Sequence, residues 1–174
     1  FATWSESKPV AVWRPEWNVP VDEAAATQSA LGLDALRSTR PIRTRVDTPE
    51  EINEVFDGIA YEKSAAVLGM VEGFVGADAF RKGVSSYLSK YAYGNAAGED
   101  FWTEMAAITG RPVDLIMRSY VEQPGAPVVS VRSACTAGTT EIALRQERFI
   151  GAPGAAGSCG SCSRKAWCSA CWGE

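Results

Sequence analysis

Consecutive segments between residues 61 and 123 share one pattern, in which apolar side chains recur every three or four residues between short polar or glycine links. Such spacing gathers apolar side chains on one face of an α-helix. The predicted faces comprise Val67, Leu68, Val71, Phe74 and Val75; Phe80, Val84, Tyr87, Leu88 and Tyr91; and Val113, Ile116, Met117 and Tyr120. Because the links are short, we expect neighbouring helices to pack into a compact, mainly α-helical array that ends near residue 123.

Capping residues place several of the helix boundaries. In "DTPEE", Thr48 can cap a helix, Pro49 suits its first position, and Glu51 stands where a capping box needs it. Gly110 follows "EDFWTEMAAIT" and indicates a helix end. An earlier alanine-rich helix is predicted over residues 21–36, and an extended connector follows it over residues 37–46.

The character of the sequence changes after residue 123. "APVVSVRSAC" and "TEIALRQERF" are rich in β-forming residues and flank "TAGT", which predicts a β-hairpin within residues 124–150. Cys135, in the first strand, is expected to be a small buried apolar residue. Residues 151–174 form a tail rich in glycine, alanine, serine and cysteine.

Composition excludes several classes of function. The net charge of −4, without a run of lysine and arginine, argues against a nucleic-acid partner. No apolar stretch approaches the roughly 20 residues of a membrane span. The chain has no histidine, which removes Ser-His-Asp and Cys-His catalysis and every zinc site that needs a histidine ligand. Catalysis by this chain alone would have to use carboxylates, Tyr, Lys, Ser or Cys.

Four stretches in order resemble one family. They are "FATW", "PEEINEVFDGIAYEKSAAVLGM", "FRKGVSSYLSKYAYGNAAGEDFW" and "MRSYVEQPGAPVVSV". Together they are similar to the zinc aminopeptidases of the aminopeptidase N (gluzincin) family, over residues 1–149. The resemblance implies that residues 1–123 form the helical C-terminal lobe of a thermolysin-like catalytic domain. It also implies that the hairpin at 124–150 begins a β-sandwich-like domain.

The resemblance locates the family's metal site outside this sequence. In these enzymes an HExxH helix supplies two histidine ligands and a glutamate base, and a second helix supplies the third ligand, a glutamate. Residues 1–3 look like the end of that second pattern. The chain is therefore expected to be a fragment that starts two residues after the third ligand. The family's cofactor is zinc, and we expect this chain to bind none at that site.

Two neighbouring residues are the predicted catalytic group. The resemblance implies that Tyr61 hydrogen-bonds the oxyanion of the tetrahedral intermediate, and that Glu62 and Lys63 lie near the substrate cleft. Spacing alone favours other roles. Tyr61 would suit packing near a helix start with its hydroxyl on a backbone carbonyl, and Glu62 and Lys63 would suit a solvated face.

The tail contains two CxxC pairs, Cys159 with Cys162 and Cys168 with Cys171. Four thiolates can bind zinc in a tetrahedral site. Only five residues separate the pairs, which requires a very tight loop. Disulfides or free thiols are a second interpretation, and a tail that takes no part in the fold is a third.

Three functional hypotheses follow. The first is a fragment of an enzyme that removes N-terminal residues from peptides, without aminopeptidase activity of its own. Its partners would be a peptide substrate and the missing N-terminal half. The second is a metal-free hydrolase that uses two carboxylates, as glycosidases do. The third is a non-catalytic module that self-associates as a homo-oligomer, because half a domain leaves apolar surface uncovered.

Overall fold

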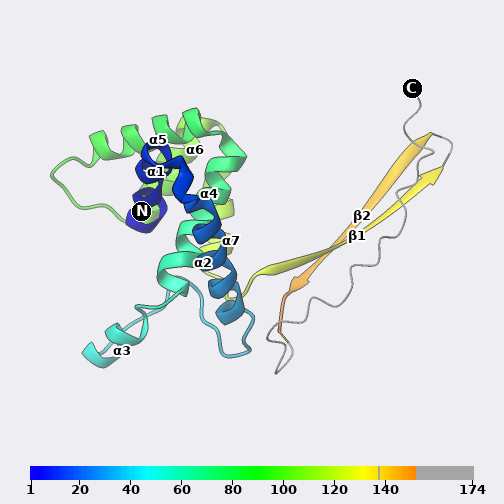
Figure 1. Cartoon of the computed structure of the whole chain (residues 1–174), viewed down its shortest axis with the longest axis horizontal. Coiled ribbons are helices and arrows are strands. Elements are labelled where there is room, and N and C mark those ends of the chain that lie inside the picture. Colours follow the sequence, from blue (N-terminus) through cyan, green and yellow to red (C-terminus); the bar gives the residue numbers. More distant parts are fainter. Residues whose placement is uncertain (137, 152–174) are drawn as a thin grey trace. The chain divides into compact units, whose positions relative to one another are not determined.

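The computed structural model describes residues 1–136 and 138–151 of the chain. It contains two compact units, a helical unit at Phe1–Gly125 and a second unit that begins at Ala126 with a β-hairpin. Figure 1 shows both units. The expected mainly helical lobe followed by a β-hairpin is confirmed. None of the helices in these residues has the length and apolarity to cross a membrane.

Helices of three kinds build the first unit, and two strands build the second. The α-helices are α1 (Ala2–Trp13), α2 (Val19–Asp34), α3 (Pro49–Glu54), α4 (Ser64–Val75), α5 (Ala77–Lys90), α6 (Gly98–Thr109) and α7 (Val113–Val121). A 3-10 turn, η1 (Pro15–Trp17), joins α1 to α2, and a π-helical turn, η2 (Ile59–Lys63), leads into α4. The strands are β1 (Pro127–Thr136) and β2 (Thr139–Arg148).

Helices α4 to α7 enclose the core of the helical unit. The buried cluster consists of Val67, Leu68, Val71, Phe80, Phe101, Trp102, Met105, Val113 and Met117. Gly83 of α5 faces Met105 of α6 so closely that a Cβ at position 83 would lie 2.2 Å from the Met105 sulfur. The missing side chain at this position lets α5 and α6 approach each other.

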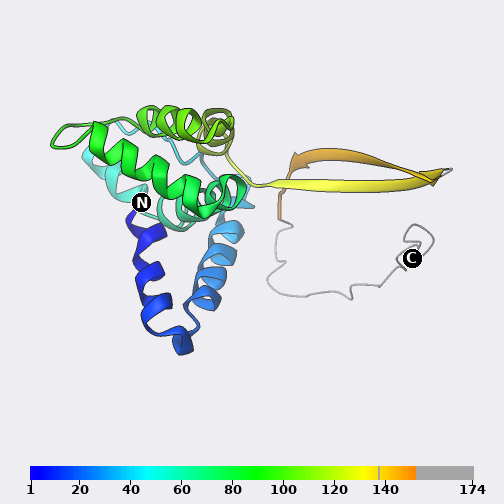
Figure 2. The same cartoon turned by 90° about the horizontal axis from the view of Figure 1, so that it is seen from above.

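The first two helices form an antiparallel pair that extends from the rest of the unit (Figure 2). The chain reverses direction through η1 and through Asn18, whose φ of 51° lies in the left-handed region that asparagine tolerates. No residue of α1 is buried. Trp4 and Phe1 nevertheless contact the core, with ring centroids 5.0 Å from Phe80 and 4.8 Å from Phe101 respectively.

Two residues of the predicted apolar faces are exposed instead. Leu88 is 61% exposed because, at about 100° per residue, it lies some 80° around α5 from Phe80. Phe74 lies at the edge of the buried face of α4, near the helix end, where the Arg111 guanidinium is 5.3 Å from its ring. The predicted faces were therefore too wide.

The predicted caps are present. The Thr48 hydroxyl accepts a hydrogen bond from the Glu51 backbone N–H, and the Glu51 carboxylate accepts one from the Thr48 N–H. Gly110 ends α6 with a φ of 63°, a conformation that glycine adopts without steric cost. The connector at residues 37–46, expected to be extended, is irregular, with a turn at residues 37–38 and a bend at residues 42–43.

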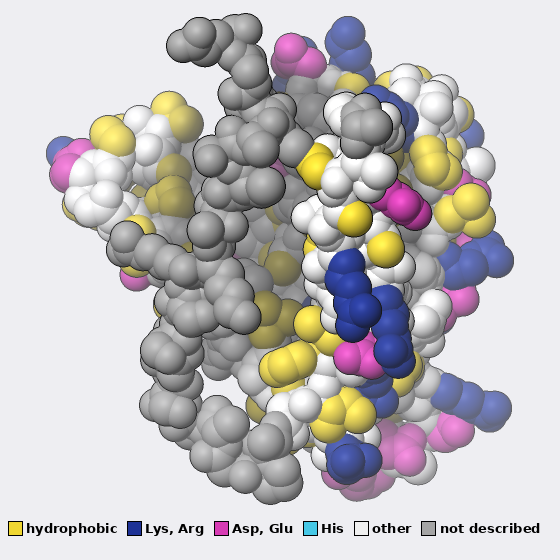
Figure 3. Space-filling view, turned by 90° about the vertical axis from the view of Figure 1, so that its right-hand side faces the viewer, with side chains coloured by type: hydrophobic (Ala, Val, Ile, Leu, Met, Phe, Trp, Pro, Cys, Tyr) yellow, Lys and Arg dark blue, Asp and Glu magenta, His cyan; other side chains and the backbone are white. Residues whose placement is uncertain are grey.

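The hairpin has two different faces. In the antiparallel register Val131 pairs with Leu144 and Ser133 with Ile142, while Ser130 pairs with Arg145 and Ala134 with Glu141. Successive side chains alternate between faces, so the first two pairs lie on an apolar face and the last two on a polar face. All the described strand positions are exposed. Figure 3 shows hydrophobic and basic side chains together on the face of the molecule that it draws.

The prediction of a buried Cys135 is wrong. Cys135 lies in β1, and every residue of that strand is exposed, because a sheet of two strands has no second layer to cover it within the residues that the structure describes.

Candidate functional site

Tyr61 lies on the π-helical turn η2, between an irregular segment and α4. The Lys63 N–H donates to the Gly58 carbonyl at 2.9 Å, five residues back, and this bond gives the turn its wide winding. Tyr61 is 44% exposed, and its ring centroid lies 6.2 Å from that of Phe56. Its hydroxyl makes no hydrogen bond to any described residue, so the carbonyl partner that spacing alone allowed is not present. Such π-helical turns occur frequently at functional sites.

Glu62 is half-buried and lines a cleft of about 590 Å³ among α1, α2 and α4. Figure 2 shows α1 and α2, which both contribute lining residues, extending from the rest of the helical unit. Four further carboxylates line the cleft: Glu6, Asp22, Glu23 and Glu72. Tyr61 is not among the lining residues, so of the two predicted site residues only Glu62 faces this cleft.

Two of the cleft carboxylates are engaged by neighbouring side chains. Glu72 Oε2 accepts hydrogen bonds from the Lys8 ammonium at 2.7 Å and from the Trp4 indole N–H at 3.1 Å. Glu23 accepts a hydrogen bond from the Ser7 hydroxyl. These contacts join α1 to α4 and to α2. Both carboxylates therefore hold together the helices that line the cleft.

Lys63 is buried, contrary to the interpretation of a solvated face. Its ammonium forms an ion pair with Asp34 at 2.7 Å, and both residues are almost fully covered. The sequence carried a signal for this burial. Lys63 follows Ile59 by four residues and precedes Val67 by four, and both of those are buried, so Lys63 lies on the inner face of the turn.

The start of η2 is held by a second ion pair. Asp57 Oδ1 accepts hydrogen bonds from the backbone N–H groups of Ile59 and Ala60, both at 3.0 Å. The Arg40 guanidinium donates to the same oxygen at 2.7 Å and to the Val55 carbonyl at 2.9 Å. The sequence did not indicate this ion pair, because Arg40 and Asp57 lie 17 residues apart in the chain.

The described residues do not fit a zinc site of the family type. Among residues 1–136 and 138–151, no group of three or more His, Cys, Asp or Glu side chains could hold a metal ion. The whole sequence contains no histidine. The predicted thiolate site at Cys159, Cys162, Cys168 and Cys171 lies outside the described residues.

Comparison with known proteins identifies the class of protein to which the chain belongs. Residues 1–120 match the family described as "Peptidase family M1 domain", a segment that covers the whole α1–α6 array, η2 and most of α7. The chain belongs to peptidase family M1, a family of zinc-dependent aminopeptidases. The expected resemblance is therefore confirmed.

Curated relatives support the same assignment. The chain is 40% identical over 151 residues to "Tricorn protease-interacting factor F2" of Thermoplasma acidophilum, and 40% identical over 151 residues to "Aminopeptidase 2, mitochondrial" of Saccharomyces cerevisiae. It is 36% identical over 156 residues to "Aminopeptidase M1" of Arabidopsis thaliana. These matches cover 86–88% of this chain but only 16–19% of the relatives.

Proposed function

We propose that this chain supplies part of the catalytic domain of an aminopeptidase, which removes N-terminal residues from peptides. Its contribution is the Tyr61 hydroxyl, as the donor that stabilises the oxyanion. Zinc would activate the attacking water when bound, and its ligands would come from residues outside this chain. Support comes from membership of family M1 and from the names of relatives such as "Aminopeptidase 2, mitochondrial".

The observation that carries the proposal is the state of Tyr61. Its side chain is about half exposed, its hydroxyl has no hydrogen-bond partner among the described residues, and it projects from the π-helical turn η2. A phenol O–H in this state is free to donate to a substrate oxygen. A preorganised donor aimed at developing negative charge lowers a barrier by about 3 kcal/mol.

Glu62 has a different proposed role. It faces the cleft with α1 and α2, whereas Tyr61 does not. We therefore propose that Glu62 contacts substrate or the neighbouring part of the catalytic domain rather than the oxyanion. The carboxylate-based hydrolase gains little from this cleft, because two of its five carboxylates, Glu72 and Glu23, already bind Lys8 and Ser7.

A chimera tests the proposed role of Tyr61. Residues 1–150 would replace the matching segment of the yeast aminopeptidase, to which the chain is 40% identical. The chimera is expected to hydrolyse aminoacyl anilides in a chelator-sensitive reaction. Tyr61→Phe should lower its kcat by roughly 10²- to 10³-fold with little change in KM, because the lost hydrogen bond forms in the transition state.

The controls distinguish a specific effect of Tyr61 from a general effect of removing a tyrosine hydroxyl. Tyr93→Phe, at an exposed loop position, should leave kcat unchanged. The natural chain alone should be inactive on aminoacyl anilides, esters and glycosides. A Tyr61→Phe chimera with full kcat would contradict the proposal, and chelator-resistant glycoside cleavage by the chain alone would favour the carboxylate hydrolase.

We also propose self-association, on the evidence of the hairpin. One face of this two-stranded sheet carries Val129, Val131, Ile142 and Leu144, all exposed. A hairpin of two strands is marginally stable in water unless its apolar face packs against something. In a solution of this chain alone, we expect the apolar face of a second copy to pack against this face.

A further inference from the structure

The buried ion pair between Asp34 and Lys63 has no role in the proposed chemistry. Asp34 is 0% exposed and Lys63 6%, and they are the two buried charged residues within the described part of the helical unit. Asp34 Oδ1 also accepts hydrogen bonds from the Gly125 N–H at 3.0 Å and the Thr39 hydroxyl at 3.2 Å. Burying two charges is costly and often stabilises a fold no more than an apolar pair would. The pair therefore calls for another explanation.

The pair sits at the end of η2. Lys63 is the last residue of that turn, two residues after Tyr61, and its ammonium also donates to the Gly125 carbonyl at 3.4 Å. A π-helical turn is rare and occurs mostly as a single turn, frequently at a functional site. Ion pairs hold η2 at both ends. Arg40 and Asp57 form the pair at its start, and Asp34 and Lys63 form the pair at its end.

We propose that Asp34 and Lys63 are positioning residues for Tyr61. The ion pair anchors the end of η2 against the end of α2 and against Gly125. This anchor keeps the five-residue hydrogen bond from Lys63 N–H to the Gly58 carbonyl, which sets the direction in which Tyr61 projects. The importance of that direction for catalysis rests on the proposed function. The claim that the ion pair holds the turn in its conformation does not, because it concerns the turn alone.

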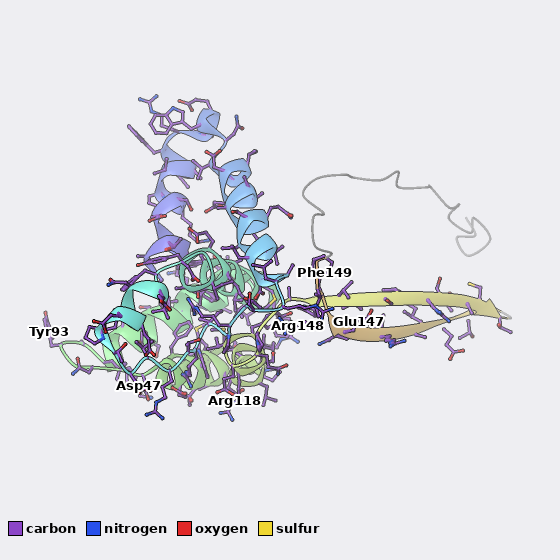
Figure 4. The ribbon with its side chains drawn as sticks, turned by 90° about the horizontal axis from the view of Figure 1, so that it is seen from below. Asp47, Tyr93, Arg118, Glu147, Arg148 and Phe149 are labelled. Atoms are coloured by element: carbon purple, nitrogen blue, oxygen red, sulfur yellow. The ribbon has the colours of Figure 1, made fainter. Side chains whose placement is uncertain are left out.

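Fluorine NMR of the full chain tests whether the ion pair holds the turn in its conformation. The sequence has five tyrosines, so labelling with 3-fluorotyrosine yields five signals, and Tyr61→Phe assigns the one of interest. Tyr93 is fully exposed at the tip of the loop between α5 and α6, where Figure 4 shows it pointing outward. Its signal supplies the reference for a tyrosine in water.

The informative variant is the double substitution Asp34→Asn with Lys63→Met. It removes both charges without leaving one of them buried and unpaired. We expect the helical circular dichroism to persist and the Tyr61 signal to move toward that of Tyr93. Amide exchange at position 63 should become roughly tenfold faster, since the bond to Gly58 loses its support.

The matched control is Lys90→Met with Glu104→Gln, which removes the ion pair between α5 and α6 and should leave the Tyr61 signal in place. A folded Asp34→Asn, Lys63→Met variant with an unmoved Tyr61 signal and unchanged exchange would overturn the proposal. If that variant does not fold, Lys63→Arg keeps the charge but alters its reach, and an unmoved signal there would overturn it equally. Neither measurement involves hydrolysis, so a failure here is distinct from a failure of the Tyr61→Phe chimera.

Discussion

Glu104 shows how one residue makes the helical unit sensitive to pH. Its carboxylate accepts hydrogen bonds from the Lys90 ammonium at 2.8 Å and the Ser86 hydroxyl at 2.6 Å, which join α6 to α5. The hydrogen bond from Lys90, followed by that from Ser86, lowers the pKa of Glu104 below its ordinary value of 4.5. The folded state therefore holds this proton less tightly than the unfolded state does.

The sign of the pH effect follows from that difference. Stabilisation by Glu104 is present above its unfolded pKa, near 4.5, and is lost as the pH falls through the lower pKa of the folded state. Glu104→Gln should thus lower Tm at neutral pH and reduce the further loss of Tm on acidification below about pH 4.5. Thermal unfolding of both proteins across this range checks the expectation. Glu54→Gln, at an exposed position on α3, is the control and should keep the natural pH profile.

At the scale of elements, the contact between α5 and α6 depends on one glycine. Met105 is fully buried opposite Gly83, and a Cβ there would lie 2.2 Å from its sulfur and 3.0 Å from its methyl carbon. Alanine is favoured over glycine in a helix by roughly 0.5–1 kcal/mol. Overpacking of a filled core costs about 1–3 kcal/mol, so the clash outweighs the helix preference.

We therefore expect Gly83→Ala to lower the free energy of unfolding by about 1–2 kcal/mol. Gly73→Ala in α4 is the matched control, because nothing lies within 4 Å of its added Cβ. It should stabilise the chain by about 0.5 kcal/mol through helix preference alone. Denaturant unfolding measures both variants. Equal effects would show that Met105 moves aside freely.

Elements with local signals could be predicted from the sequence, and the π-helical turn could not. Apolar spacing, the Thr48 cap and Gly110 all act within one or two turns, so helices and their ends were predictable. The winding of η2 depends on contacts from Arg40, Asp34 and Gly125, which no local pattern contains. Tyr61 and Glu62 were reachable only through the family resemblance, and no local pattern indicates that Glu62 lines the cleft while Tyr61 does not.

At the scale of the whole molecule, the proposed self-association depends on the apolar face of the hairpin. Leu144 pairs with Val131 at the centre of the apolar face, and burying one leucine contributes about 2 kcal/mol. Leu144→Lys should accordingly weaken self-association by roughly tenfold or more, as measured by sedimentation velocity. Ser130→Lys adds the same charge on the polar face and should change the association little. A natural chain that remains monomeric at high concentration would refute the idea.

The buried pair also bears on how the chain folds during its synthesis. Gly125 follows Asp34 by 91 residues and Lys63 by 62. A contact between residues so far apart forms late, because the intervening chain must first be made and brought together. Until Gly125 emerges from the ribosome, Asp34 and Lys63 lack their backbone partner. Completion of the turn that carries Tyr61 therefore waits for the last residue of the helical unit, and a nascent chain holds that tyrosine in place only when the unit is whole.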